Sequence, residues 1–220
     1  MRHSNLIARL VSPFVDFNKM TVYEKVGFVL SMTHALMSLF GSMYLLALYE
    51  KSEIYDTYLY HIIVAVSLSH YMTDFLIVAY YHVQFMFIVH HLVSVIMITT
   101  FYIGGHLATD TYPFSMLFME ITNPFQIIFS YLSSTKQTHK KRFFVVSTIF
   151  TFMFTFVRCL ILPFIYRDIQ RAIYDDVRVE GMHAVLCEVC GITGAIGSLM
   201  WNYNLLKGYY NKVYLPLIKK

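Results

Sequence analysis

Nine ionisable side chains lie inside long apolar runs of this sequence, where such groups are rare. They are His34, His61, His70, Asp74, His90, His91, Glu120, Arg158 and Glu188. Ionisable groups within a bilayer are expensive to bury, and they tend to mark a functional site. An imidazole beside a carboxylate can take a proton from a hydroxyl or an amine, or can itself become acylated. The pattern therefore predicts acid–base chemistry inside a membrane.

Asp74 and His91 are expected at the same depth on neighbouring helices. Each lies about seven residues from the short polar turn that separates their two apolar runs. With a rise of about 1.5 Å per residue, both side chains lie roughly 10 Å from the cytosolic face. The carboxylate is therefore predicted to pair with the imidazole and to orient it.

One polar cavity is predicted to collect most of these groups. His70 lies four residues before Asp74, on the same helix face. His34 comes out at a similar depth of roughly 16 Å, and Glu120 lies slightly deeper, one turn before Pro124. The predicted cavity residues are His34, His70, Asp74, Glu120 and one or both of His90 and His91. For any single histidine, packing against a serine or a tyrosine is an equally good interpretation.

Two other groups of residues receive structural interpretations. Arg158 and Glu188 come out at similar depth on consecutive helices, and they are expected to form a structural ion pair. Cys187 and Cys190 have CxxC spacing, but a zinc site takes about four ligands and no second pair follows. We therefore expect no bound metal.

The elements that must position these groups are membrane-spanning helices. The chain has 220 residues, of which 57% are apolar and only 14% are charged, and its mean hydropathy is +0.55. Too few charges are present to build the polar shell of a soluble enzyme, and the apolar content excludes a disordered chain. About six spans of roughly 20 residues fit this length. They are predicted at 24–49, 57–80, 84–104, 112–132, 143–166 and 182–206, with a kink at Pro124.

The basic residues predict the orientation of these spans. Twelve lysines and arginines fall in the N-terminal segment, in the loop after the fourth span and in the C-terminal segment, against four on the opposite side. Since cytosolic loops are enriched in basic residues, both termini are predicted to face the cytosol. The fold class is thus an all-α polytopic membrane protein, with about six helices around a polar intramembrane cavity. Its predicted parts are a cytosolic or interfacial segment (1–22), a transmembrane domain (23–208) and a cytosolic tail (209–220).

Several short motifs resemble those of the TLC-domain family, which includes the ceramide synthases. They occur in the family's order between about residues 30 and 208. The matching positions are Thr33-His34, Asp74, the paired His90-His91, Glu120 to Phe125, Arg158 with Pro163, Trp201 and Lys207-Gly208. The acidic block that accompanies the histidine pair in ceramide synthases is absent, because 114–120 retains only its glutamate. The chain therefore resembles the shorter, non-synthase branch, whose members act in membrane lipid composition.

The resemblance and the histidines together suggest two functions. The first is a lipid acyltransferase that draws acyl-CoA from the cytosol. In it, His90 or His91 would be the base or nucleophile, Asp74 would orient it, and Glu120, His34 and His70 would line the cavity. The second is a non-catalytic lipid sensor, carrier or cargo receptor that uses the same cavity. A proton-coupled transporter is a third reading, which the lack of visible inverted repeats disfavours.

The expected partners follow from the same two functions. They are membrane lipids, with acyl-CoA as a co-substrate, no tightly bound cofactor and no nucleic acid. Whether the chain forms a homodimer is left open by the sequence. The family resemblance implies the endoplasmic reticulum membrane.

Overall fold

The computed structural model describes residues 15–49, 58–80, 85–103, 116–137, 141–175 and 181–218, and it contains no β-strand among them. The all-α fold expected from the composition is therefore confirmed. The first helices are the single-turn η1 (Phe17–Lys19), then α2 (Val22–Tyr49), α3 (Tyr58–Tyr80) and α4 (Phe85–Ile103). A short helix over 116–120 leads into α6 (Asn123–Ser134).

The last two helical passes are each interrupted by a π-helical segment. In the first, α7 (Lys141–Phe154) continues through η2 (Thr155–Ile161) into α8 (Leu162–Asp175). In the second, α9 (Gly181–Tyr209) continues through η3 (Tyr210–Tyr214) into α10 (Leu215–Ile218). A π-helical turn carries an extra residue, so it changes the direction in which the following side chains point.

Within the described part of the chain, three helical passes are long and apolar enough to cross a membrane by length and composition. They are Glu24–Ala47, Lys141–Arg167 and Ala184–Tyr214, and a shorter apolar helix covers Phe85–Thr99. Wherever their residues are described, the predicted spans coincide with helices, except for a turn at 121–122 within the fourth. The number of spans stays a prediction. The start of the fourth predicted span, at 112–115, lies outside the described residues.

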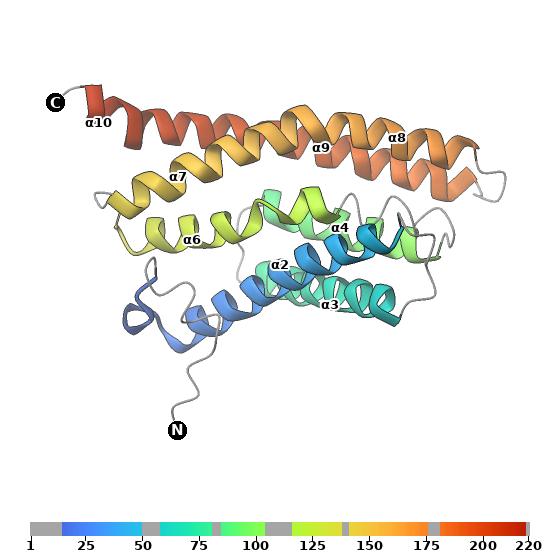
Figure 1. The fold of residues 1–220 in the computed structure, drawn as a ribbon, viewed down its shortest axis with the longest axis horizontal. Coiled ribbons are helices and arrows are strands. Elements are labelled where there is room, and N and C mark those ends of the chain that lie inside the picture. Colours follow the sequence, from blue (N-terminus) through green and yellow to red (C-terminus); the bar gives the residue numbers. More distant parts are fainter. Residues whose placement is uncertain are drawn as a thin grey trace.

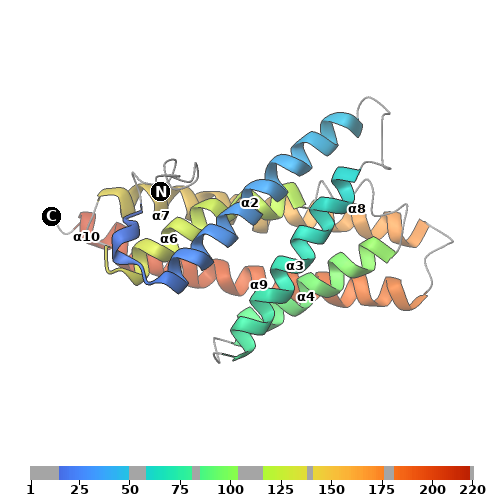
Figure 2. The same ribbon diagram turned by 90° about the horizontal axis from the view of Figure 1, so that it is seen from below.

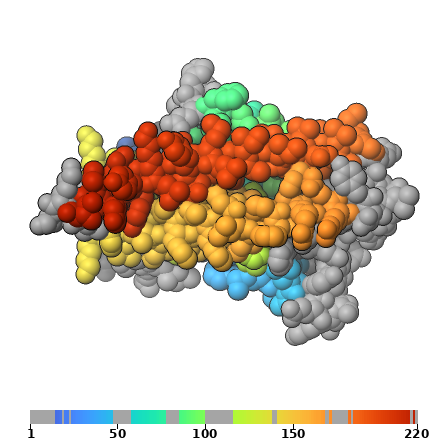
Figure 3. Space-filling view, turned by 90° about the horizontal axis from the view of Figure 1, so that it is seen from above, coloured from blue at the N-terminus to red at the C-terminus, as the bar shows by residue number. Residues whose placement is uncertain are grey.

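The helices pack in three layers (Figure 1). The passes α7–η2–α8 and α9–η3–α10 run side by side in opposite directions, and α2 and α3 lie on the other side of the molecule. Between them, α4 contacts α3 and α9, while α6 contacts α2 and α7. Figure 2 shows α3 and α4 running obliquely to α9. In Figure 3, the last two passes run across the middle of one face, with a hollow between them.

Basic residues collect at one end of this bundle. The start of α2, the connection from α6 to α7, and α10 all lie at the left end in Figure 1. The described lysines and arginines near this end include Lys25, Lys136, Lys141, Arg142 and Lys212. This grouping agrees with the predicted orientation, in which these segments face the cytosol.

Local sequence signals account for two of the helix boundaries. At the start of α2, the Thr21 amide donates to Glu24 Oε2 at 2.8 Å and the Glu24 amide donates to Thr21 Oγ1 at 3.3 Å. This reciprocal pair is a capping box. The predicted interruption near Pro124 is confirmed: the chain turns at 121–122, and the proline takes up the first turn of α6. Proline suits that position because the missing N–H would have no partner there.

The segment before α2 packs onto the basic end of the bundle. Val15 is buried in a cluster with side chains from α2, α6, α7 and η3. The Asp16 amide donates to the Tyr131 hydroxyl at 3.0 Å, and that hydroxyl donates to the Asp16 carbonyl at 2.9 Å. Residues 1–14 of the predicted N-terminal segment lie outside the described part of the chain.

Candidate functional site

A polar network centred on Glu120 joins four elements of the bundle. The Glu120 carboxylate is fully buried. Its Oε1 accepts a hydrogen bond from the Tyr71 hydroxyl of α3 at 2.8 Å, and its Oε2 accepts one from Asn123 Nδ2 of α6 at 2.7 Å. His34 Nδ1, on α2, lies 3.9 Å from Oε2. Glu120 occupies this position because the helix over 116–120 ends there, just before the turn.

His34 links this carboxylate to a serine-lined contact between α2 and α3. Its Nε2 lies 3.3 Å from Ser67 Oγ, which lies 3.2 Å from Ser38 Oγ. Both serines are buried. The His34 ring also stacks on the His70 ring, with 4.0 Å between the centroids and 19° between the planes. Small residues such as serine let two membrane helices approach closely and hydrogen-bond across the contact.

The predicted pair between Asp74 and a histidine of α4 is not formed. Asp74 Oδ2 instead lies 3.5 Å from His70 Nε2, four residues earlier on the same helix. The prediction matched the depths of two helices but could not give their rotation, and the i, i+4 neighbour lies closer. The Nδ1 atom of His91 is buried and makes no hydrogen bond to any described residue.

His90 and His91 flank the Tyr71 ring but face different surroundings. The ring of His91 lies 5.8 Å from that of Tyr71. The ring of His90 lies 6.3 Å from that of Tyr71 and 5.5 Å from that of Trp201 on α9. Only His90 of the two lines a described cavity. The sequence left open which histidine faces the cavity, and the geometry assigns it to His90.

Two adjoining cavities meet at His90 and Arg158. The inner cavity, of about 260 Å³, lies between α4, η2, α8 and α9, and thioether, aliphatic and thiol groups form most of its wall. The side cavity, of about 200 Å³, extends from the same two residues to Phe85 and Trp201. His34, His70, Asp74, His91 and Glu120 are absent from both linings. These residues were predicted to line one cavity, but they form a compact network behind its wall.

Arg158 also differs from its predicted role. Its Nη2 donates to the Met119 carbonyl at 2.9 Å, and its guanidinium lies 5.7 Å from the Phe154 ring centroid. Among the described residues, no ion pair joins Arg158 to Glu188. The reason lies in η2, because its π-helical turn shifts Arg158 away from the direction that a regular helix would give.

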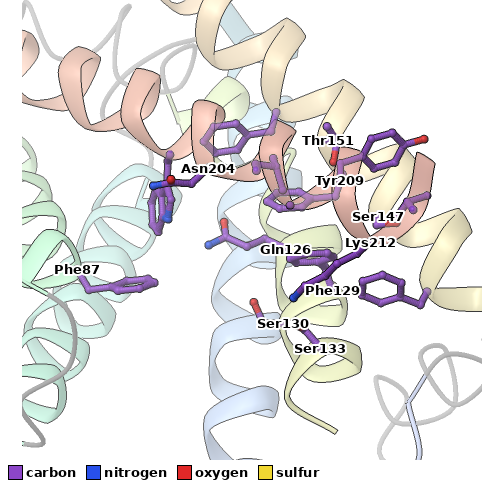
Figure 4. A pocket seen from close by; sticks show the side chains of 17 residues that line it. Phe87, Gln126, Phe129, Ser130, Ser133, Ser147, Thr151, Asn204, Tyr209 and Lys212 are labelled. Carbon is purple, nitrogen blue, oxygen red and sulfur yellow. The ribbon is translucent and has the colours of Figure 1, made fainter. Parts of the chain in front are cut away.

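A third cavity, which we call the basal pocket, lies nearer the basic end of the bundle. It has a volume of about 300 Å³ and lies between α6, α7 and the end of the α9–η3 pass. Figure 4 shows its labelled side chains, with Phe87 facing the others from α4. Trp201 lines both the basal pocket and the side cavity. Its ring contacts those of Phe87, His90 and Phe154, and it therefore forms the wall between them.

The sequence model described as the TLC domain, named TRAM_LAG1_CLN8, matches residues 26–207. The chain belongs to the TLC-domain family. The match covers the polar network and the inner and side cavities, so these features lie within the TLC domain. No curated protein and no solved structure matches the chain. Membership indicates a membrane protein with a lipid-related function.

Two central residues of the TLC domain were missed by the sequence analysis. Tyr71, which contacts Glu120 and four histidine rings, carries no charge and looks like one of many interfacial aromatics. Asn123 lies three residues after Glu120, a spacing that brings side chains together. This spacing could have predicted its contact with Glu120. Among the described residues, no group of three or more histidine, cysteine, aspartate or glutamate side chains is arranged to hold a metal ion.

Proposed function

We propose that this TLC domain transfers an acyl group from acyl-CoA to a hydroxyl or amine of a membrane lipid, with His90 as the general base. The observation that supports it most is that His90 and Arg158 share one largely apolar cavity. An apolar wall suits an acyl chain, and a few polar groups in such a wall can fix the reacting end. We place this activity in the endoplasmic reticulum membrane.

In the proposed reaction, the lipid hydroxyl or amine attacks the thioester carbonyl carbon, and His90 takes its proton. The carbonyl oxygen becomes an oxyanion, which Arg158 stabilises. Arg158 Nε is buried and donates to no described residue, so it is a donor that the oxyanion can use. The carbon–sulfur bond then breaks, and the departing thiolate of CoA receives the proton from His90. The products are the acylated lipid and free CoA.

The network behind the wall has a positioning role in this proposal. His90 follows Val89 on α4, beside Tyr71, and Tyr71 is fixed by its hydrogen bond to Glu120. His34, His70 and Asp74 surround that pair without lining the cavity. These residues therefore act through Tyr71, and their substitution is expected to alter rate and stability together.

The experiment compares His90→Gln with His91→Gln in purified protein reconstituted with lipid and labelled acyl-CoA of several chain lengths. General-base catalysis contributes about 10²–10⁴-fold, so His90→Gln is expected to lower lipid labelling at least about 100-fold. His91→Gln is the matched control, since His91 lies on the same helix but outside the cavities. Equal labelling by both variants would contradict the assignment of His90.

A lipid carrier or sensor is the second candidate, and the mutual contacts of His34, His70, Asp74 and Glu120 favour it. Groups that interact with one another are less available for chemistry on a ligand. This function predicts that one lipid co-purifies unchanged and that no acyl-CoA labels it. That result, with a correctly folded wild-type protein and every chain length tested, would replace acyl transfer.

A further inference from the structure

The basal pocket contains polar groups that the proposed acyl transfer does not use. Lys212 is the one charged residue among the lining side chains, and it is exposed. Neither a hydrogen bond nor an ion pair joins its side chain to another described residue, and the same holds for the side chains of Gln126, Ser130 and Asn204. In Figure 4, the ammonium end of Lys212 and the amide of Gln126 turn toward the same space as Ser130.

A buried hydroxyl in the same pocket provides an independent observation that points to a ligand. Thr151 lines the same pocket and is only 6% exposed. Its Oγ1 makes no hydrogen bond to any described residue, although buried polar atoms nearly always have a partner. An occupant with an oxygen acceptor would satisfy this hydroxyl.

Each of the two cationic residues that line a cavity lies in a π-helical segment. Arg158 lies in η2 and Lys212 lies in η3, which are both π-helical. Such turns are rare in proteins, and those that do occur are frequently found at functional sites. The turn in η3 places Lys212 on the pocket, while the preceding Lys207, on the regular part of α9, is not among the lining residues.

Aromatic rings form much of the remaining wall of the pocket. The Phe129 ring lies 5.6 Å from that of Phe143 and 5.4 Å from that of Phe150. A largely aromatic wall that also carries a cation, amides and hydroxyl groups fits an amphiphile with an anionic head. A cationic end of a membrane protein attracts such heads electrostatically.

We propose that the basal pocket binds the phosphate group of an amphiphile, with Lys212 as its cation and Gln126, Ser130 and Asn204 as donors. A phosphate has several strong acceptor oxygens, which match these donors. A membrane phospholipid and CoA both carry this group. The pocket is distinct from the inner cavity, and the binding does not depend on acyl transfer.

The only tryptophan of the chain, Trp201, lines this pocket and reports binding directly. The full chain in a neutral maltoside detergent is titrated with dihexanoyl phosphatidic acid, with CoA and with dihexanoylglycerol, which lacks phosphate. Trp201 emission is followed for the wild type, Lys212→Gln, Lys207→Gln and Thr151→Val. Lys207→Gln removes a charge from the same end of the bundle without changing the pocket.

Phosphatidic acid is expected to change Trp201 emission and to saturate. Lys212→Gln is expected to raise its apparent Kd about tenfold, as befits the loss of one charge-assisted hydrogen bond, and Lys207→Gln is expected to leave it unchanged. Thr151→Val should raise the Kd by a smaller factor. The same dependence on Lys212 with CoA alone would identify CoA as the source of the phosphate.

Three results would overturn the proposal: no saturable response to either phosphate compound, equal affinity in wild type and Lys212→Gln, or equally tight binding of dihexanoylglycerol. None of them bears on lipid labelling by acyl-CoA, so the two proposals fail separately. A variant that has lost its fold is recognised by a changed Trp201 emission before any ligand is added.

Discussion

The hydroxyl of Tyr71 lies 2.8 Å from Oε1 of the fully buried Glu120 and donates a hydrogen bond to it. This bond connects α3 to the point where the chain turns at 121–122. The same tyrosine ring lies 5.5 Å from the ring of His70 and 5.8 Å from that of His91. Tyr71 therefore joins the carboxylate to the histidines of two helices.

Tyr71→Phe is expected to destabilise the protein by about 1–3 kcal/mol, because a buried carboxylate loses a donor while the aromatic ring stays. For a chain of this size, that corresponds to a lower Tm of about 2–4 °C for each kcal/mol. Thermal unfolding in detergent measures the change. Tyr203→Phe, at an exposed position of α9, is the control, and an equal Tm for both variants would contradict the role of Tyr71.

Gly191→Ala is expected to destabilise the contact between α8 and α9 by about 1–3 kcal/mol, the usual cost of overpacking. A Cβ atom at Gly191 would overlap the ring of Tyr166, so the ring would have to move. The Tyr166 hydroxyl would then lose its hydrogen bond to the Glu188 carbonyl. Gly194→Ala is the matched control on the same helix, since a Cβ there meets nothing within 4 Å. If both variants unfold at the same temperature, the close approach of Gly191 to Tyr166 does not contribute to stability.

Lys136→Gly is expected to stabilise the protein. Lys136 follows the end of α6 with φ of 55°, a left-handed conformation that costs an L-residue about 1–2 kcal/mol. Glycine avoids this strain but loses more entropy on folding, so the net gain is about 0.5–1 kcal/mol. Unfolding measurements should show a higher Tm for Lys136→Gly than for Lys136→Ala, which removes the same side chain but keeps the strain. A higher Tm for the alanine variant would refute this explanation.

Trp201→Ala is expected to connect the basal pocket with the side cavity, because the indole forms the wall between them. Cys159 and Cys190 line the inner cavity, which adjoins the side cavity. A small polar thiol reagent should therefore label these two cysteines several times faster in the variant. Cys187, which is buried outside these linings, is an internal reference. A uniform rise for all three cysteines would indicate general loosening instead.

The sequence predicted the helices well because a long apolar run within a membrane must satisfy its backbone hydrogen bonds internally, and a helix does so. The break near Pro124 was also predicted, since proline cannot continue a helix. The predicted depths brought His34, His70 and Glu120 together correctly, as the 4.0 Å stacking of the two histidine rings shows. Depth depends only on the rise per residue, which is constant along a regular helix.

The depth of a residue does not predict how its helix is rotated about its own axis. Asp74 was assigned to a histidine of α4 but lies beside His70, because depth alone does not say which face a neighbour presents. Arg158 was assigned to Glu188, but the π-helical η2 changes its direction. The residue types in Thr155–Ile161 do not indicate a π-helical turn. The sequence therefore could not predict the contacts that Arg158 makes.

The serine-lined contact between α2 and α3 bears on how the chain enters the membrane during synthesis. Helix α3 carries His61, His70 and Asp74 within an otherwise apolar stretch. Its buried Ser67 meets Ser38 of α2, and its His70 stacks on His34. Helix α2 thus covers polar groups that lipid would otherwise solvate poorly. Pairing of α3 with α2 is therefore expected to lower the free-energy cost of inserting α3 into the bilayer.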